Sequence, residues 1–229
     1  MWLDSLPASS PNLNPAGALL TRLRAAARRG VARRFTVPGT GGALSVRLES
    51  LTTDADAAQL AVGQLGTLRA VGTEMRWRDV VAQRVELSCS NVHVRPSPRP
   101  TAVAAPVTVE VLLTHDVVRA WIAAARPSVQ YDMTRGQAQL RWSAHPRWGA
   151  VEIVPEVTAR ELILRPAGIR VGPARFTSPR WAPIVRVKLA RLPRGLVVRD
   201  VSVGDQGITV RATADEWSAS IPTLLDLLS

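Results

Sequence analysis

Cysteine, lysine, phenylalanine and tyrosine are all scarce in this sequence, and each scarcity narrows the class of protein. Cys89 is the only cysteine, so the chain forms neither an intramolecular disulfide nor a cysteine-based zinc site. Lys188 is the only lysine, so the formal net charge of +11 comes almost entirely from arginine. A high-GC genome produces this bias without any function, whereas attraction to a membrane surface or nucleic acid is the functional interpretation.

The sequence also lacks long apolar runs and any catalytic signature. No run approaches the roughly 18 apolar residues of a membrane span, and residues 1–7 lack the basic and apolar regions of a signal peptide. We therefore expect a cytoplasmic protein. The three histidines stand apart without metal-site spacing, and no nucleophile elbow or phosphate-binding loop is present. We expect no enzymatic activity, no catalytic residues, no metal and no cofactor.

The clearest pattern that is present lies between Pro193 and Trp217. Val201 and Val203 alternate with polar residues before Gly204-Asp205-Gln206-Gly207, and Ile208, Val210 and Ala212 alternate after it. Alternation with period two on both sides of a short turn predicts a β-hairpin with one apolar face. Such a face must pack against other elements.

Two further segments share an unusual change of phase. In 85–96, apolar residues occupy odd positions up to Cys89 and even positions from Val92. In 162–173 the same spacing recurs around Gly168. One strand keeps both sets on one face only if a residue is inserted, so we predict β-bulges at Asn91 and Gly168. Either an internal duplication or chance explains the similarity of the two segments.

Three helices are expected. Residues 15–34 combine apolar residues at helical spacing with arginines, and this basic amphipathic pattern fits either a helix on an anionic membrane or one packed on the sheet. The arginines assigned to a membrane surface are Arg22, Arg28, Arg29, Arg33 and Arg34. A second helix runs from Thr114 to Arg126; its apolar residues Val117, Trp121 and Ile122 predict that the sheet wraps it. A third, amphipathic helix begins at Trp217 and runs to the end of the sequence, and residues 1–14 form an arm before a single domain, 15–229.

Tryptophan is over-used, with seven residues against two Phe and one Tyr. Trp142 and Trp148 flank a turn that carries Arg141 and Arg147 next to them, and Arg180 precedes Trp181. Trp beside Arg suits lipid headgroups at a membrane interface, and it also suits base stacking on single-stranded nucleic acid. Ordinary packing is the third interpretation.

The hairpin and the segment 162–172 (LILRPAGIRVG) resemble the LmeA-like family of actinobacterial phospholipid-binding proteins. The resemblance covers roughly the C-terminal two thirds and carries structural motifs, not catalytic ones. It implies a tubular lipid-binding fold with an apolar groove. The start of this chain departs from the exported members of that family, which puts their cellular role in doubt.

Together these observations predict an α+β fold, with a long bent antiparallel β-sheet curled around the helix 116–125 and helices at both ends. The expected function is non-enzymatic binding of a phospholipid or similar diacyl lipid. The protein is expected to associate peripherally with anionic lipids on the inner face of the cell membrane. Six residues are assigned to the lipid: Val117, Trp121, Ile122, Trp142, Trp148 and Trp181. Arg141, Arg147 and Arg180 are assigned to the headgroup. The alternatives are a basic nucleic-acid-binding protein, which lacks a supporting motif, and an interaction module with a filled core.

Overall fold

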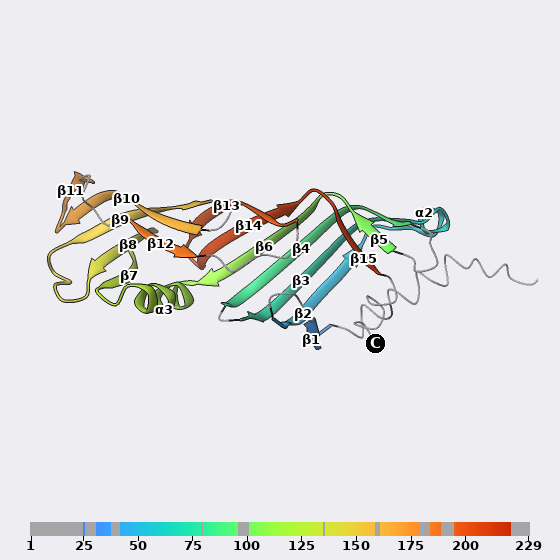
Figure 1. Ribbon diagram of the computed structural model, residues 1–229, viewed down its shortest axis with the longest axis horizontal. Helices are drawn as coiled ribbons and strands as arrows, with labels where there is room; N and C mark the ends of the chain where they lie inside the picture. Colours follow the sequence, from blue (N-terminus) through green and yellow to red (C-terminus); the bar gives the residue numbers. More distant parts are fainter. Residues whose placement is uncertain are drawn as a thin grey trace, which may run out of the picture.

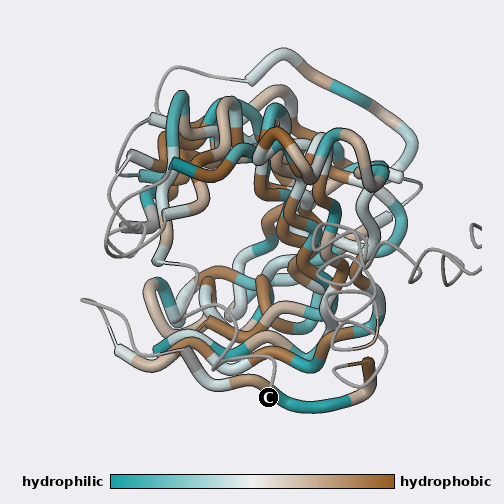
Figure 2. Tube along the Cα trace, turned by 90° about the vertical axis from the view of Figure 1, so that its right-hand side faces the viewer, coloured by the Kyte–Doolittle hydropathy of each residue, from teal (hydrophilic) through white to brown (hydrophobic). Residues whose placement is uncertain are grey.

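The computed structural model describes residues 25, 31–37, 42–78, 80–95, 101–134, 136–158, 161–178, 184–188 and 195–220. They form an elongated body in which two antiparallel β-sheets follow one another along the long axis (Figure 1). Seen along that axis, hydrophobic and hydrophilic residues alternate along the strands (Figure 2). This is the period-two pattern expected of sheets with one apolar face.

The larger sheet has nine strands in the order β1-β2-β3-β4-β6-β14-β13, with β5 between β4 and β15. Its strands are β1 (Arg34–Val37), β2 (Leu44–Thr53), β3 (Gln64–Trp77), β4 (Val80–Arg95), β5 (Thr101–Ala104), β6 (Val107–Thr114), β13 (Val197–Gly204), β14 (Gly207–Ala214) and β15 (Trp217–Ser220). A short helix, α2 (Ala57–Ala61), connects β2 and β3. β3 and β4 form a long antiparallel hairpin.

The smaller sheet has six strands in the order β11-β10-β9-β8-β7, and β12 also pairs with β10. Its strands are β7 (Val129–Thr134), β8 (Gln137–Trp142), β9 (Ala150–Val157), β10 (Glu161–Val171), β11 (Ala174–Thr177) and β12 (Val185–Lys188). The helix α3 (His115–Ala125) follows β6 and leads into β7, so it connects the two sheets.

The hairpin predicted between Pro193 and Trp217 is formed by β13 and β14. Gly204 pairs with Gly207 across the turn, and Val201 pairs with Val210. Gly207 has φ +153°, and a Cβ there would lie 2.0 Å from the carbonyl oxygen of Leu113. Glycine is therefore required where β14 approaches β6, and the turn keeps its register with both neighbouring strands.

Both predicted bulges are present. The pairing of β3 with β4 shifts between Cys89 and Val92, and Asn91 has φ +48°. The pairing of β9 with β10 shifts between Pro166 and Gly168. After the first shift the apolar residues return to the same side, since Cys89 and Val92 share one hydrophobic cluster. After the second, Ile169 packs against the cluster that contains Leu164. The two bulged strands lie in different sheets.

Several sequence-based expectations for the ends and loops are wrong. Residues 31–37 form a turn and β1 where the end of the first helix was expected. Trp217–Ser220 forms β15 where the start of the third helix was expected. The strand β5 was not predicted, because it is held by hydrogen bonds to β4 and β15 that local sequence does not reveal. Residues 1–14, 15–24, 26–30 and 221–229 lie outside the described residues.

The helix α3 is also less enclosed than its composition predicted. Thr114 caps it, and its side chain accepts a hydrogen bond from the Val117 amide. Val118 and Ile122 are buried, whereas Ala123–Ala125 are exposed. One face therefore packs against the protein, chiefly on β7, and the sheet does not wrap the helix. Alanine contributes too little apolar area to require burial, so the composition overstated it.

One hydrophobic cluster joins both sheets and α3. Its fully buried members include Ile208 of the larger sheet, Leu140 and Leu164 of the smaller sheet, and Ile122 of α3. A second cluster around Cys89 and Val107 lies toward the other end of the larger sheet. The first cluster fixes the two sheets to each other and so sets the geometry of the surfaces described next.

Candidate functional site

A row of apolar residues crosses the nine-stranded sheet from β3 to β13. Gly72, Val85, Val111, Val210 and Val201 are paired in register on successive strands. They therefore share one face of the sheet. The four valines contact the main hydrophobic cluster but are each only half-buried. The centre of this sheet thus carries apolar surface that the protein covers only in part.

A second row runs beside the first and extends the same face. Ala70, Leu87, Val109, Ala212 and Val198 are paired in register on the same strands. The side chains from β3, β4 and β6 are again half-buried, whereas those from β14 and β13 are buried. The two rows together define the valine face. Its residues are short, so the surface is smooth and contains no polar side chain.

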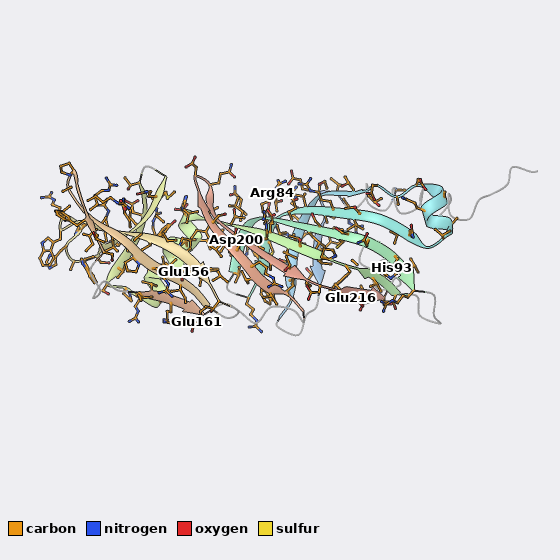
Figure 3. All side chains as sticks on the ribbon, turned by 90° about the horizontal axis from the view of Figure 1, so that it is seen from above. Arg84, His93, Glu156, Glu161, Asp200 and Glu216 are labelled. Atoms are coloured by element: carbon orange, nitrogen blue, oxygen red, sulfur yellow. The ribbon has the colours of Figure 1, made fainter. Side chains whose placement is uncertain are left out.

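The opposite face of the same sheet is charged and largely paired. Glu86 of β4 lies directly opposite Glu110 of β6. Arg69 lies 2.6 Å from Glu86, and Arg211 lies 2.8 Å from Glu110. The arginines offset the repulsion between the two carboxylates. Figure 3 shows Arg84 and Asp200 of this face near the middle of the molecule.

An open cavity of about 280 Å³ lies on this charged face beside the β13–β14 turn. Its lining consists of Arg84, Glu86, Glu110, Leu112, Thr209 and the turn residues 204–207. Arg84 pairs with Glu49 at 3.2 Å, and the two glutamates pair with arginines as well. Arg84, Glu86 and Glu110 are thus already matched, and the mixed lining does not suit an acyl chain.

His115 at the start of α3 links the two sheets. Its Nδ1 lies 2.9 Å from the Tyr131 hydroxyl of β7, and its Nε2 lies 3.1 Å from the carbonyl oxygens of both Gly204 and Asp205. The Nε2–H donates to these carbonyls, which leaves Nδ1 to accept from the tyrosine. Burial raises the pKa of Tyr131 to about 12, so its hydroxyl stays protonated.

The outer face of the six-stranded sheet contains a carboxylate enclosed by two arginines. Arg170 donates to Glu152 Oε1 at 2.7 Å, and Arg175 donates to Oε2 at 2.7 Å. The Glu152 side chain is 3% exposed because these guanidinium groups lie over it. The hydrogen bond from Arg170, which outweighs the opposing effect of burial, lowers the pKa of Glu152, and the bond from Arg175 adds to it. The arrangement joins β9, β10 and β11.

The predicted lipid-contacting residues separate into two groups in the structure. Ile122 is buried in the main cluster, and Val117 and Trp121 are half-buried on α3, so these belong to packing around the helix. Trp142 and Trp148 are exposed at the far end of the six-stranded sheet. Trp181 lies outside the described residues. The structure therefore does not gather the six residues at one site.

The predicted arginines are likewise divided. Arg141 contacts Asp132 at 3.5 Å and Gln139 at 3.4 Å, whereas Arg147 is exposed and has no ion-pair partner among the described residues. Arg34 begins β1 and pairs with Glu74, which places it in the sheet and not in a membrane-binding helix. Arg33 stands in the turn before it. Arg22, Arg28, Arg29 and Arg180 lie outside the described residues.

The histidines each serve a local contact. His93 Nδ1 lies 3.1 Å from the Asn91 carbonyl oxygen, and the His145 ring stacks on Trp148 with centroids 3.9 Å apart. Within the part of the chain that the structure describes, no three His, Cys, Asp or Glu residues gather as metal ligands would. None of the described helices combines the length and the apolar character that crossing a bilayer requires.

The sequence analysis did not identify three of these features: the valine face, the two ion pairs of Glu152 with Arg170 and Arg175, and the exposed Phe176. The valine face had a signal, because β4 and the hairpin β13–β14 show period-two alternation, but the register that aligns the rows is a tertiary property. Comparison with protein-family models, curated proteins and solved structures found no match in any of the three.

Proposed function

We propose that this protein binds a phospholipid or a similar diacyl lipid along the valine face and associates peripherally with anionic membrane. The observation that carries the proposal is the in-register row Val85–Val111–Val210–Val201, which is apolar, continuous over four strands and only half-buried. A continuous exposed apolar surface on a protein marks a binding surface. Each buried methylene of an acyl chain contributes about 0.8 kcal/mol, so a long chain binds well even to a shallow groove.

The shape of the valine face favours an acyl chain over a compact ligand. Valine and alanine side chains extend a short distance from the sheet, and rows from neighbouring strands run across the elongated body. We further infer that the strands curve into a tubular enclosure for the acyl chains, as the resemblance to LmeA-like proteins implies. The resemblance of the hairpin and of 162–172 to LmeA-like proteins supports the same function.

The distribution of the arginines favours a lipid over nucleic acid. Nucleic-acid binding requires a tract of unpaired basic side chains along the backbone path. On the charged face of the larger sheet, Arg69, Arg84 and Arg211 are each held by a glutamate. The valine face offers no aromatic residue on which bases could stack.

The decisive test compares two tryptophan substitutions on neighbouring residues of β14. Val210→Trp fills the valine face, whereas Thr209→Trp, the control, places the same ring on the charged face. The proteins are purified from the same type of cell, and bound lipid is extracted from each with organic solvent. Mass spectrometry then quantifies this lipid. We expect lipid in the wild type and in Thr209→Trp, and much less in Val210→Trp. An absence of lipid in the wild type, or equal amounts in both variants, would refute the valine face as the site.

A further inference from the structure

The end of the six-stranded sheet that is far from α2 carries four exposed apolar side chains, three of them aromatic. Trp148 is 67% exposed and Phe176 is 56% exposed, with Val171 at 45% and Trp142 at 38%. They come from two connections, the turn 143–149 between β8 and β9 and the hairpin β10–β11. Both connections lie at the same end of the elongated body (Figure 1). We call these four residues the distal tip.

Pairing in the sheet explains why apolar residues emerge at the distal tip. Tyr131, Leu140, Val151, Ile169 and Phe176 form one row in register from β7 to β11. Tyr131 and Leu140 are buried in the core, Ile169 is half-buried, and Phe176 on the edge strand is exposed. Trp142 and Val171 have the same strand parity as this row. The distal tip is therefore the continuation of the apolar core face into solvent.

The turn that carries Trp148 is held in a defined conformation. The His145 amide donates to the Trp142 carbonyl at 3.2 Å, and the Trp148 amide donates to the His145 carbonyl at 3.1 Å. The indole of Trp148 then stacks on His145 with an angle of 7° between the rings. A Cβ at Gly149 would lie 2.5 Å from the Arg170 carbonyl oxygen, so the turn sits directly against β10. The exposed ring is thus positioned before any partner binds.

The charge around the distal tip is positive. Residues 143–149 and 171–177 contain Arg147 and Arg175 and neither aspartate nor glutamate. Arg170 and Arg175 share the single carboxylate of Glu152, so this cluster keeps an excess positive charge. Arg147 lies beside Trp148 and has no ion-pair partner among the described residues. The tip therefore complements an anionic surface.

We propose that the distal tip is the membrane-docking surface, and that it inserts Trp148 and Phe176 into the interface of a bilayer with anionic lipids. This inference rests on the proposed function, because it specifies which surface of the lipid-binding protein contacts the membrane. Tryptophan favours the level of the headgroups, and arginine pairs bidentately with their phosphates. Docking at one end leaves the valine face, which lies farther along the body, free to receive the lipid.

The described residues at the opposite end of the body support this choice of surface. Val62 near α2 is 73% exposed, but it is a single small side chain that follows Asp56 of the same connection. Trp217 at 39% exposure stands next to Glu216, which pairs with Arg95. Neither place combines neighbouring aromatic rings with unpaired positive charge in the way that the distal tip does. The two ends therefore provide an internal control.

The test is flotation of the full chain with vesicles of phosphatidylcholine containing phosphatidylglycerol. The variants are Trp148→Ser, Phe176→Ser and Arg147→Gln, with Val62→Ser as the control at the other end. All four side chains are exposed, so the fold is retained, and circular dichroism verifies it. We expect each aromatic substitution to weaken vesicle partition about tenfold, and Val62→Ser to leave it unchanged. Arg147→Gln should weaken partition and reduce its dependence on salt.

The outcomes separate this inference from the proposed function. If the wild type floats with anionic vesicles and the aromatic variants float equally well, the distal tip is not the docking surface, while lipid extraction still tests the valine face. If the wild type does not float, both the tip and the membrane association are wrong. Tight binding of the wild type to an oligonucleotide without flotation would overturn the inference in favour of the nucleic-acid class.

Discussion

In the six-stranded sheet the row Tyr131–Leu140–Val151 is buried in the core, whereas in the nine-stranded sheet the row Val85–Val111–Val210 is only half-buried. Both rows arise from the same kind of alternating strand. The difference is that α3 packs on β7 of the smaller sheet and has few contacts with the larger one. A sheet closed by a helix supplies stability, and a sheet left partly open supplies surface for a ligand.

The outer faces of the two sheets differ in a parallel way. On the smaller sheet, Glu152 is enclosed by two guanidinium groups. On the larger sheet, the pair Arg211–Glu110 is half-exposed, with side-chain exposures of 51% and 37%. Exposed pairs of this kind contribute about 0–1 kcal/mol, and enclosed charge-assisted hydrogen bonds contribute more. The enclosed contacts therefore reinforce the smaller sheet at Glu152, and removing that charge should cost more than removing the charge of an exposed pair.

The largest effect is expected from Leu140→Ala in the closed row. Leu140 is fully buried between neighbouring strands, and its truncation removes contacts that the core cannot restore. We expect a loss of about 2–5 kcal/mol in the free energy of unfolding, measured by urea denaturation. Val154→Ala, on β9 but exposed, is the control and should cost little. A loss as small as that of the control would mean that this sheet is not the closed half.

A smaller effect is expected from Glu152→Gln, which removes the charge from the enclosed carboxylate. Hydrogen bonds to charged groups contribute about 1.5–3 kcal/mol, and we expect a loss in that range near neutral pH. Glu156→Gln, which affects the exposed pair with Arg165, is the control.

The pH dependence of this difference sharpens the test. The folded pKa of Glu152 lies below its usual value of 4.5, so its stabilisation is present above that value and is lost as pH falls through the folded pKa. The gap in unfolding free energy between the wild type and Glu152→Gln should therefore narrow on acidification. Urea denaturation over a series of pH values measures it, and a gap that stays constant into acid would contradict the assignment.

The smallest effect on stability is expected from Val111→Ala in the open row. Val111 is half-buried, so losing part of its apolar area should cost about 1 kcal/mol or less. The same substitution should lower the amount of lipid that co-purifies, because it removes contact area from the valine face. Denaturation and lipid quantification on one preparation measure both. A stability loss as large as that of Leu140→Ala, with no change in lipid, would show that the two rows are equally closed.

Local sequence patterns predicted a large part of the fold. The alternation around Gly204–Gly207 predicted the hairpin, and the phase change at Asn91 and Gly168 predicted two bulges, because the period of a strand is fixed by backbone geometry. The helix predicted from Thr114 to Arg126 is α3, with nearly its observed bounds. Short strands such as β5 and β15 were missed, since each exists through its partner and not through its own pattern.

The candidate site was predictable only in its residue types. Adjacent arginine and tryptophan predicted a contact with lipid or nucleic acid for both Arg141–Trp142 and Arg147–Trp148, but in the structure Arg141 is held by Asp132. Sequence alone determined the alternation of the strands, the bulges, the cap of α3 and the excess of arginine. Tertiary structure decided which apolar rows are closed, that Phe176 emerges from the core and which arginines remain unpaired. Those properties depend on register between distant strands and on where α3 packs, and neither is encoded within a single local segment.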